Sequence, residues 1–127
     1  MTGTQKIKIL TAARAMIAAG WVRPTANSDN ICDARGYPVD VASKSATRWN
    51  ICGALEMADY QEIGTRPNIN NAKSMSGIAE LTAACPVEFD DKIFGDVLDW
   101  ERKKIRTMDD VLALFDAAIA HAGVENA

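Results

Sequence analysis

Apolar residues recur at helical spacing near the start of the chain. The repeat follows the i, i+3, i+7 pattern of one helix face, which predicts a helix over residues 4–19. The residues that define this face are Leu10, Ala13 and Ile17. Gly20 comes next, at the position where a glycine commonly takes the left-handed conformation that ends a helix. Trp21 is then expected to pack back onto the last turn.

The periodicity is lost over residues 23–43. Two short apolar segments, residues 31–33 and 37–39, flank the sequence Ala-Arg-Gly. This arrangement predicts one short β-hairpin whose turn places Gly36 at a positive φ angle. Pro38 counts against the hairpin, because proline has no N–H to donate to a strand ladder.

The next helix is predicted from Ser43 or Ser45 to Tyr60. Its apolar residues occur on nearly all sides, which is typical of a helix at the centre of a small domain. They are Ala46, Trp49, Ile51, Gly53, Leu55, Met57, Ala58 and Tyr60. Gly53 beside Ala54 favours the close approach of a neighbouring helix, because small residues let two backbones come near each other.

Two helices are expected after a weakly patterned loop over residues 61–73. The first covers residues 74–85 and ends before Pro86. The second is shorter, with Asp90 as its N-cap and Trp100 at its end.

The last helix is predicted from its capping pattern. Thr107 and Asp110 form the Thr-x-x-acid sequence of a capping box, and apolar residues then repeat at helical spacing. Gly123 is expected to end this helix. Together the patterns predict an all-α fold, a compact single domain over residues 1–127 of about five helices with one short β-hairpin.

Composition and charge exclude several classes of function. Of the 127 residues, 48% are apolar, which is enough for a core. No stretch approaches the ~18 consecutive apolar residues of a membrane span. The formal charge of −3 lacks the positive footprint of a general nucleic-acid binder. The basic cluster of Arg102, Lys103, Lys104 and Arg106 is flanked by acidic residues, as on a solvated surface.

The residues that commonly carry chemistry do not form a recognisable site in the sequence. The cysteines, Cys32, Cys52 and Cys85, are odd in number and widely spaced, which indicates free thiols and predicts a cytoplasmic protein. With His121 they equal the ligand set of a structural zinc site, but no two have the spacing of a zinc knuckle. His121 is better interpreted as a charge near a helix C-terminus than as a catalytic base. We therefore predict no metal, no cofactor and no specified reaction.

The three tryptophans allow two interpretations. As core anchors, which is the favoured interpretation, each buries on the order of 200 Å². As a shared pocket wall, they would face polar side chains nearby. The candidate pocket or interaction residues are Trp21, Asp33, Arg35, Tyr37, Arg48, Trp49, Asn50, Trp100 and Arg102.

Short motifs follow one another in a defined order along the chain. They are Gly-Trp at 20–21, Gly-Tyr-Pro-Val at 36–39, Trp-Asn-Ile-Cys-Gly-Ala-Leu at 49–55, Trp-Glu-Arg at 100–102 and the segment 107–119. In this order the chain resembles an uncharacterised family of small bacterial and phage proteins, with the motifs Trp-Cys-x-x-Gly-Ala-Leu and Trp-Asn-Asp. Asn50 stands where that family has Cys, and Glu101 with Arg102 replaces Asn-Asp. The resemblance implies a shared fold and a bacterial or phage origin, and the departures favour a binding protein over an enzyme.

The favoured hypothesis is a non-catalytic, cytoplasmic protein-interaction factor encoded by a phage or mobile element. It would act as an accessory protein or counter-defence inhibitor by binding a host protein, through the loops at residues 23–37 and 61–73. The alternative is a small-molecule or nucleotide-binding protein, or an enzyme, with a pocket walled by the tryptophans. The expected partner is a host protein or a second copy of the chain in a symmetric dimer, and neither a membrane nor a nucleic acid is expected.

Overall fold

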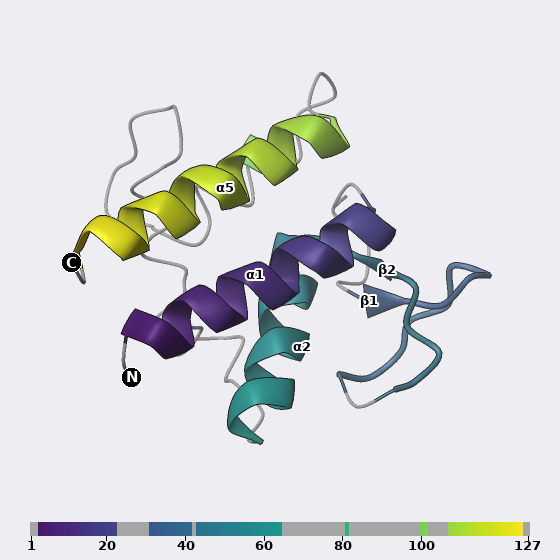
Figure 1. The fold of residues 1–127 in the computed structure, drawn as a ribbon. Helices are drawn as coiled ribbons and strands as arrows, with labels where there is room; N and C mark the ends of the chain where they lie inside the picture. The colour runs from purple at the N-terminus through teal and green to yellow at the C-terminus, as the bar shows by residue number, and fades with distance from the viewer. Residues whose placement is uncertain are drawn as a thin grey trace.

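The computed structural model describes residues 3–22, 31–41, 43–64, 81, 100–101 and 107–125. These residues form three α-helices and a two-stranded antiparallel sheet (Figure 1). The elements are α1 (Gly3–Ala19), β1 (Ile31–Cys32), β2 (Arg48–Trp49), α2 (Ile51–Ile63) and α5 (Met108–Glu125). The mostly helical fold is confirmed, but a count of five helices is not supported. The helix predicted over residues 74–85 and the one predicted from Asp90 to Trp100 lie outside the described residues, apart from Leu81 and Trp100, which are helical.

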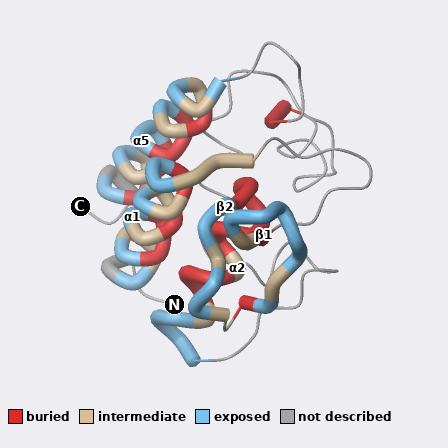
Figure 2. Tube along the Cα trace, turned by 90° about the vertical axis from the view of Figure 1, so that its right-hand side faces the viewer, coloured by how far each residue is buried: buried red, intermediate tan, exposed pale blue. Residues whose placement is uncertain are grey.

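α1 lies between the other two described helices. It packs against α5 on one side and against α2 on the other, and Figure 1 shows α1 and α5 running in opposite directions. The predicted apolar face of α1 is fully buried, and the inward sides of α1 and α5 carry the buried positions in Figure 2. Core residues with no exposed surface include Leu10, Ala13, Ile17, Leu55 and Phe115. At the surface, Arg14 of α1 pairs with Asp116 of α5, with 2.6 Å between Nε and Oδ1.

Gly20 follows α1 for a reason that differs from the predicted one. Among the described glycines only Gly36 and Gly64 have positive φ angles, so the left-handed conformation predicted for Gly20 is wrong. Its N–H still donates to the Met16 carbonyl oxygen at 3.0 Å. A Cβ atom at Gly20 would lie 2.1 Å from the carbonyl oxygen of Thr47. The glycine is therefore required by the close approach of a second backbone segment.

The backbone after α1 joins β2. Trp21 forms a parallel bridge with Trp49. The Trp49 N–H donates to the Gly20 carbonyl oxygen at 2.8 Å, and the Val22 N–H donates to the Trp49 carbonyl oxygen at 3.1 Å. The chain thus leaves α1 directly into the sheet, which explains why residue 47 comes so close to Gly20.

β1 pairs antiparallel with β2, whereas the hairpin prediction paired it with residues 37–39. The Cα partners are Ile31 with Trp49 and Cys32 with Arg48. Residues 37–39 contribute only an isolated antiparallel bridge, between Pro38 and Cys32, with the Val39 N–H donating to the Ile31 carbonyl oxygen on one side of it. The predicted turn is confirmed, and Gly36 has a φ angle of 85°.

α2 begins at Ile51, so the predicted start at Ser43 or Ser45 is wrong. Asn50 is the N-cap, with extended backbone angles of φ −88° and ψ −178°. Its side-chain Oδ1 accepts the Gly53 N–H at 2.7 Å. This bond satisfies one of the backbone N–H groups in the first turn that have no partner within the helix. β2 ends at the preceding residue, Trp49.

α5 begins with the predicted capping box. The Thr107 N–H donates to Asp110 Oδ2 at 2.9 Å, and the Asp110 N–H donates to Thr107 Oγ1 at 3.3 Å. The predicted end at Gly123 is wrong, because α5 continues through it to Glu125. None of the described helices has the length and apolar character needed to cross a membrane.

Candidate functional site

A buried carboxyl group, that of Glu101, joins Trp21 to the start of α2. Glu101 is fully buried, with 0% of its surface exposed. Glu101 Oε2 accepts two hydrogen bonds of 2.8 Å, from the Trp21 indole Nε1–H and from the Ile51 backbone N–H. Glu101 and the N-cap Asn50 therefore satisfy two amide groups in the first turn of α2. Sequence reasoning treated Glu101 only as a departure from a motif and missed this role.

The acid–base behaviour of Glu101 is set by its burial. Burial raises its pKa from 4.5 to about 8, although the hydrogen bonds from Trp21 and Ile51 act in the opposite direction. Oε1 has no hydrogen-bond partner among the described residues. The protonated acid is thus the favoured form at neutral pH. Its lack of exposed surface makes Glu101 a structural group that is closed to substrates.

Cys52, beside this carboxyl group, is unsuited to nucleophilic chemistry. Burial raises the pKa of its thiol to about 12, with smaller contributions from the carboxylates of Glu56 and Glu101 in their ionised forms. The thiolate is the reactive form of cysteine, so Cys52 is chemically inert at neutral pH. Within the ranges that the structure describes, no three His, Cys, Asp or Glu side chains are placed to hold a metal ion.

The tryptophan side chains are fixed by burial and by hydrogen bonds from two of the indole N–H groups. Trp49 and Trp100 are 8% and 5% exposed, respectively. The Trp49 indole Nε1–H donates to Met57 Sδ at 3.3 Å, and the Trp21 indole donates to Glu101 as described above. Two of the three indole N–H groups therefore have internal partners, as core anchors do.

Asp33, Arg35 and Tyr37 come together in one surface turn, the 33–37 turn. Asp33 Oδ1 accepts the backbone N–H groups of Arg35 at 2.9 Å and of Tyr37 at 3.0 Å. The Asp33 N–H in turn donates to the Tyr37 carbonyl oxygen at 2.9 Å. Tyr37 is 62% exposed, and Arg35 is exposed beside it. The turn is closed by its own hydrogen bonds and points two large side chains into solvent.

The remaining candidate residues do not join this turn. Arg48 is exposed on β2, whereas Asn50 is buried as the cap of α2. Arg102 lies outside the described residues. Among the candidates, Arg48 and the 33–37 turn are therefore at the surface, whereas Asn50 is in the interior.

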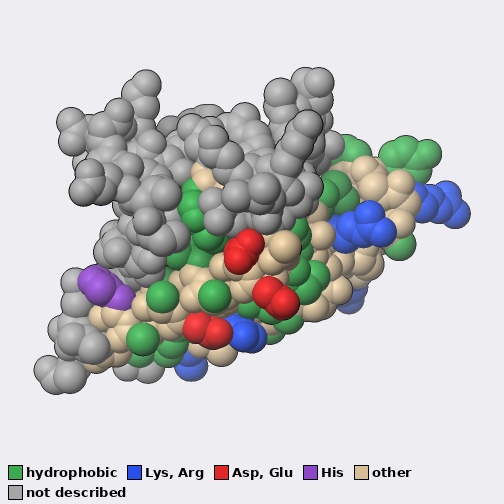
Figure 3. Space-filling model, turned by 90° about the horizontal axis from the view of Figure 1, so that it is seen from above, with side chains coloured by type: hydrophobic (Ala, Val, Ile, Leu, Met, Phe, Trp, Pro, Cys, Tyr) green, Lys and Arg blue, Asp and Glu red, His purple; other side chains and the backbone are tan. Residues whose placement is uncertain are grey.

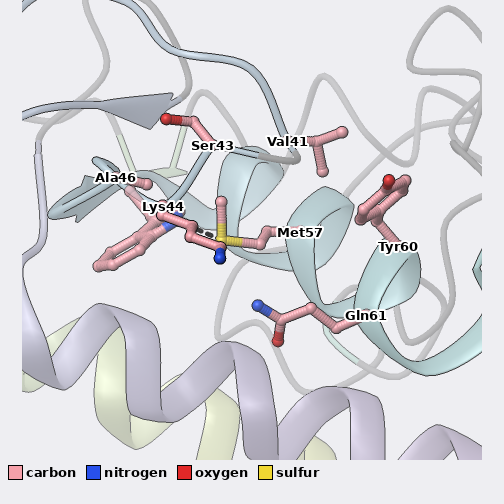
Figure 4. Close-up of a pocket in the computed structure, with 8 residues that line it drawn as sticks. Val41, Ser43, Lys44, Ala46, Met57, Tyr60 and Gln61 are labelled. Carbon is pink, nitrogen blue, oxygen red and sulfur yellow. Dashed lines mark hydrogen bonds between the residues drawn. The ribbon is translucent and has the colours of Figure 1, made fainter.

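A different pocket lies between residues 41–46 and α2 (Figure 4). Its volume is about 390 Å³. It is lined by Val41, Ser43, Lys44, Ala46, Trp49, Met57, Tyr60 and Gln61. Only Trp49 among these was predicted as a pocket residue. Met57, Tyr60 and Gln61 have i, i+3, i+4 spacing, which could have indicated their shared helix face.

Exposed acidic side chains lie on the described surface of α5, and one of them, Asp116, pairs with Arg14 of α1. Asp109 and Asp116 are exposed there, and Figure 3 shows several acidic side chains on this face with the histidine at one end.

A family of unknown function, DUF6197, matches residues 1–121. No curated protein and no solved structure matches the chain. The match spans nearly the whole sequence, so the chain belongs to the DUF6197 family.

Proposed function

We propose that this member of the DUF6197 family is a non-catalytic protein-interaction factor that contacts its partner through the 33–37 turn. The observation that carries the proposal is the bonding of one carboxylate, that of Asp33, to the backbone N–H groups of both Arg35 and Tyr37. The two exposed side chains are thus presented on a backbone that is ordered before any partner arrives.

The composition of the turn supports this role. Tyrosine and arginine are over-represented among the residues that contribute most to protein–protein binding. Tyr37 offers a large amphipathic ring with 62% of its surface exposed. The guanidinium of Arg35 has no partner among the described residues, so it is available to a carboxylate on the partner.

The anchoring of the turn lowers the entropic cost of binding. β1 is buried, and the Val39 N–H donates to the Ile31 carbonyl oxygen at 3.1 Å on the far side of the turn. Both ends are therefore tied to the sheet. A surface that is already rigid loses less conformational freedom when it binds, so more of the contact energy appears as affinity.

The proposal includes a host protein as the partner and an accessory or counter-defence role in a phage or mobile element. The chemical inertness of Cys52 supports a protein that acts by binding. Because Arg35 is cationic, the partner surface should offer a carboxylate next to a groove that accepts an aromatic ring.

The test is a quantitative capture from a bacterial lysate with the immobilised full chain, followed by affinity measurement with the purified partner. Wild type is compared with the double variant Arg35→Ala, Tyr37→Ala and with Ile63→Ala. Ile63 is the other large apolar side chain exposed among the described residues, at 44%, so its variant is the matched control. Wild type and Ile63→Ala should retain the same protein, and the double variant should lose it. Equal retention by all three, or none by the folded wild type, would refute the proposal.

A further inference from the structure

We propose that the pocket between residues 41–46 and α2 is a second site, which binds a small organic anion with a flat apolar group, such as an aromatic carboxylate. This inference is independent of the 33–37 turn, because the pocket shares no residue with it.

The size of the pocket suits a small molecule. Its volume of about 390 Å³ lies in the lower part of the range of ~300–1,000 Å³ that is typical of ligand pockets. Figure 4 shows it as a hollow between two segments, with Met57, Tyr60 and Gln61 on α2 and Val41 to Ala46 on the opposite segment. A single aromatic ring with one substituent matches these dimensions better than a nucleotide does.

The apolar wall is formed before a ligand arrives. Trp49 and Met57 are almost entirely buried, and the indole Nε1–H of Trp49 is bonded to Met57 Sδ at 3.3 Å. This bond fixes the two side chains relative to each other. A flat apolar group placed against the indole edge and the thioether would remove water from both without reordering them.

The charge of the lining selects an anion. Among the lining residues that the structure describes, Lys44 is the sole Lys or Arg, and none is Asp or Glu. A positive site on a chain of net charge −3 is a local exception that favours a carboxylate. Figure 4 shows the side chains of Lys44 and Gln61, from the two segments that line the pocket, ending on the same side of Met57 in this view.

Neutral donors complete the recognition. Ser43 Oγ accepts the Ser45 N–H at 3.1 Å, which leaves its hydroxyl proton for a ligand oxygen. The Gln61 amide supplies a further donor from α2. A carboxylate can therefore meet an ammonium, a hydroxyl and an amide, whereas the uncharged amide analogue gains little from Lys44.

The experiment is a titration of the ¹⁵N-labelled full chain with benzoate and, separately, with benzamide, followed by two-dimensional NMR. Benzoate should shift the Trp49 indole N–H and the Gln61 side-chain amide in a saturable way. The Trp21 indole N–H, which is bonded to the buried Glu101, should not move. These signals also report whether each variant is folded.

Two charge variants test the role of Lys44. Lys44→Gln should weaken benzoate binding about fivefold, the ratio that corresponds to about 1 kcal/mol for an exposed ion pair, and should leave benzamide binding unchanged. Lys8→Gln removes the same charge from an exposed position on α1 and should change neither.

Three results would overturn the inference: no saturable shift at Trp49, equal affinity for benzoate and benzamide, or equal weakening by Lys44→Gln and Lys8→Gln. The double variant Arg35→Ala, Tyr37→Ala should bind benzoate as wild type does. The experiments therefore distinguish an absence of anion binding at the pocket from an absence of partner binding at the 33–37 turn.

Discussion

Replacing Glu101 with Gln should remove a pH dependence of stability that the buried carboxyl group imposes. The folded-state pKa of Glu101, about 8, is above its ordinary value of 4.5. Between these two values the folded protein keeps a proton that the unfolded chain has released. The stability contributed by this group is therefore fully present below pH 4.5, declines as the pH rises, and is lost above about pH 8.

The magnitude follows from the two pKa values. Their difference of about 3.5 corresponds to about 5 kcal/mol, at 1.36 kcal/mol for each unit. About 3 kcal/mol of this is lost between pH 4.5 and pH 7. Glutamine keeps a carbonyl oxygen that can accept the Trp21 and Ile51 N–H groups, but it cannot ionise. The free energy of unfolding of Glu101→Gln should match wild type near pH 5 and exceed it by about 3 kcal/mol at pH 7.

The assay is urea unfolding of the full chain at several pH values from 5 to 8.5, with the slope against urea used to check that the transition is unchanged. Glu62→Gln is the matched control, because it removes an exposed carboxylate from α2, the helix whose first turn Glu101 contacts. Wild type and Glu62→Gln should lose stability in parallel as the pH rises, while Glu101→Gln should not. If wild type and Glu101→Gln follow parallel lines, or if the variant is the less stable protein at pH 8, the reasoning fails.

Three further predictions concern the start of α2 and its neighbours. Gly20→Ala places a methyl group against the Thr47 carbonyl oxygen and should cost about 1–3 kcal/mol in thermal unfolding; an unchanged melting temperature would contradict the close approach. Asn50→Ala removes the acceptor of the Gly53 N–H and should cost about 1 kcal/mol, whereas Asn50→Asp should retain most of that stability. Cys52 should resist alkylation by iodoacetamide at pH 8 in the native protein and react in urea, and mass spectrometry that finds rapid modification of the folded chain would disprove its inertness.

Features that depend on residues close together in the sequence could be predicted from the sequence alone. The buried face of α1 follows from a spacing of three and four residues, and the capping box of α5 joins Thr107 to a residue three positions away. Gly36 was recognised because its turn joins segments close in sequence. In each case the partners of an interaction lie within one turn of the chain, so their order along it is sufficient information.

The start of α2 could not be predicted in this way. The apolar positions from Ala46 onward are compatible with a helix, and the pattern does not distinguish a helix from a strand over so few residues. β2 forms because the distant β1 and the end of α1 supply its hydrogen bonds. Asn50 then caps the helix after the strand.

The candidate sites show the same division. Asp33, Arg35 and Tyr37 are close in sequence and flank the turn predicted at Gly36, but the bonds that Asp33 accepts from the other two N–H groups are seen only in the structure. The burial of Glu101 and the meeting of Lys44 with one face of α2 depend on segments far apart in the chain. Local spacing determines which residues share a helix face or a turn. Which charges become buried, and which face a pocket, is decided only when distant segments pack and exclude water.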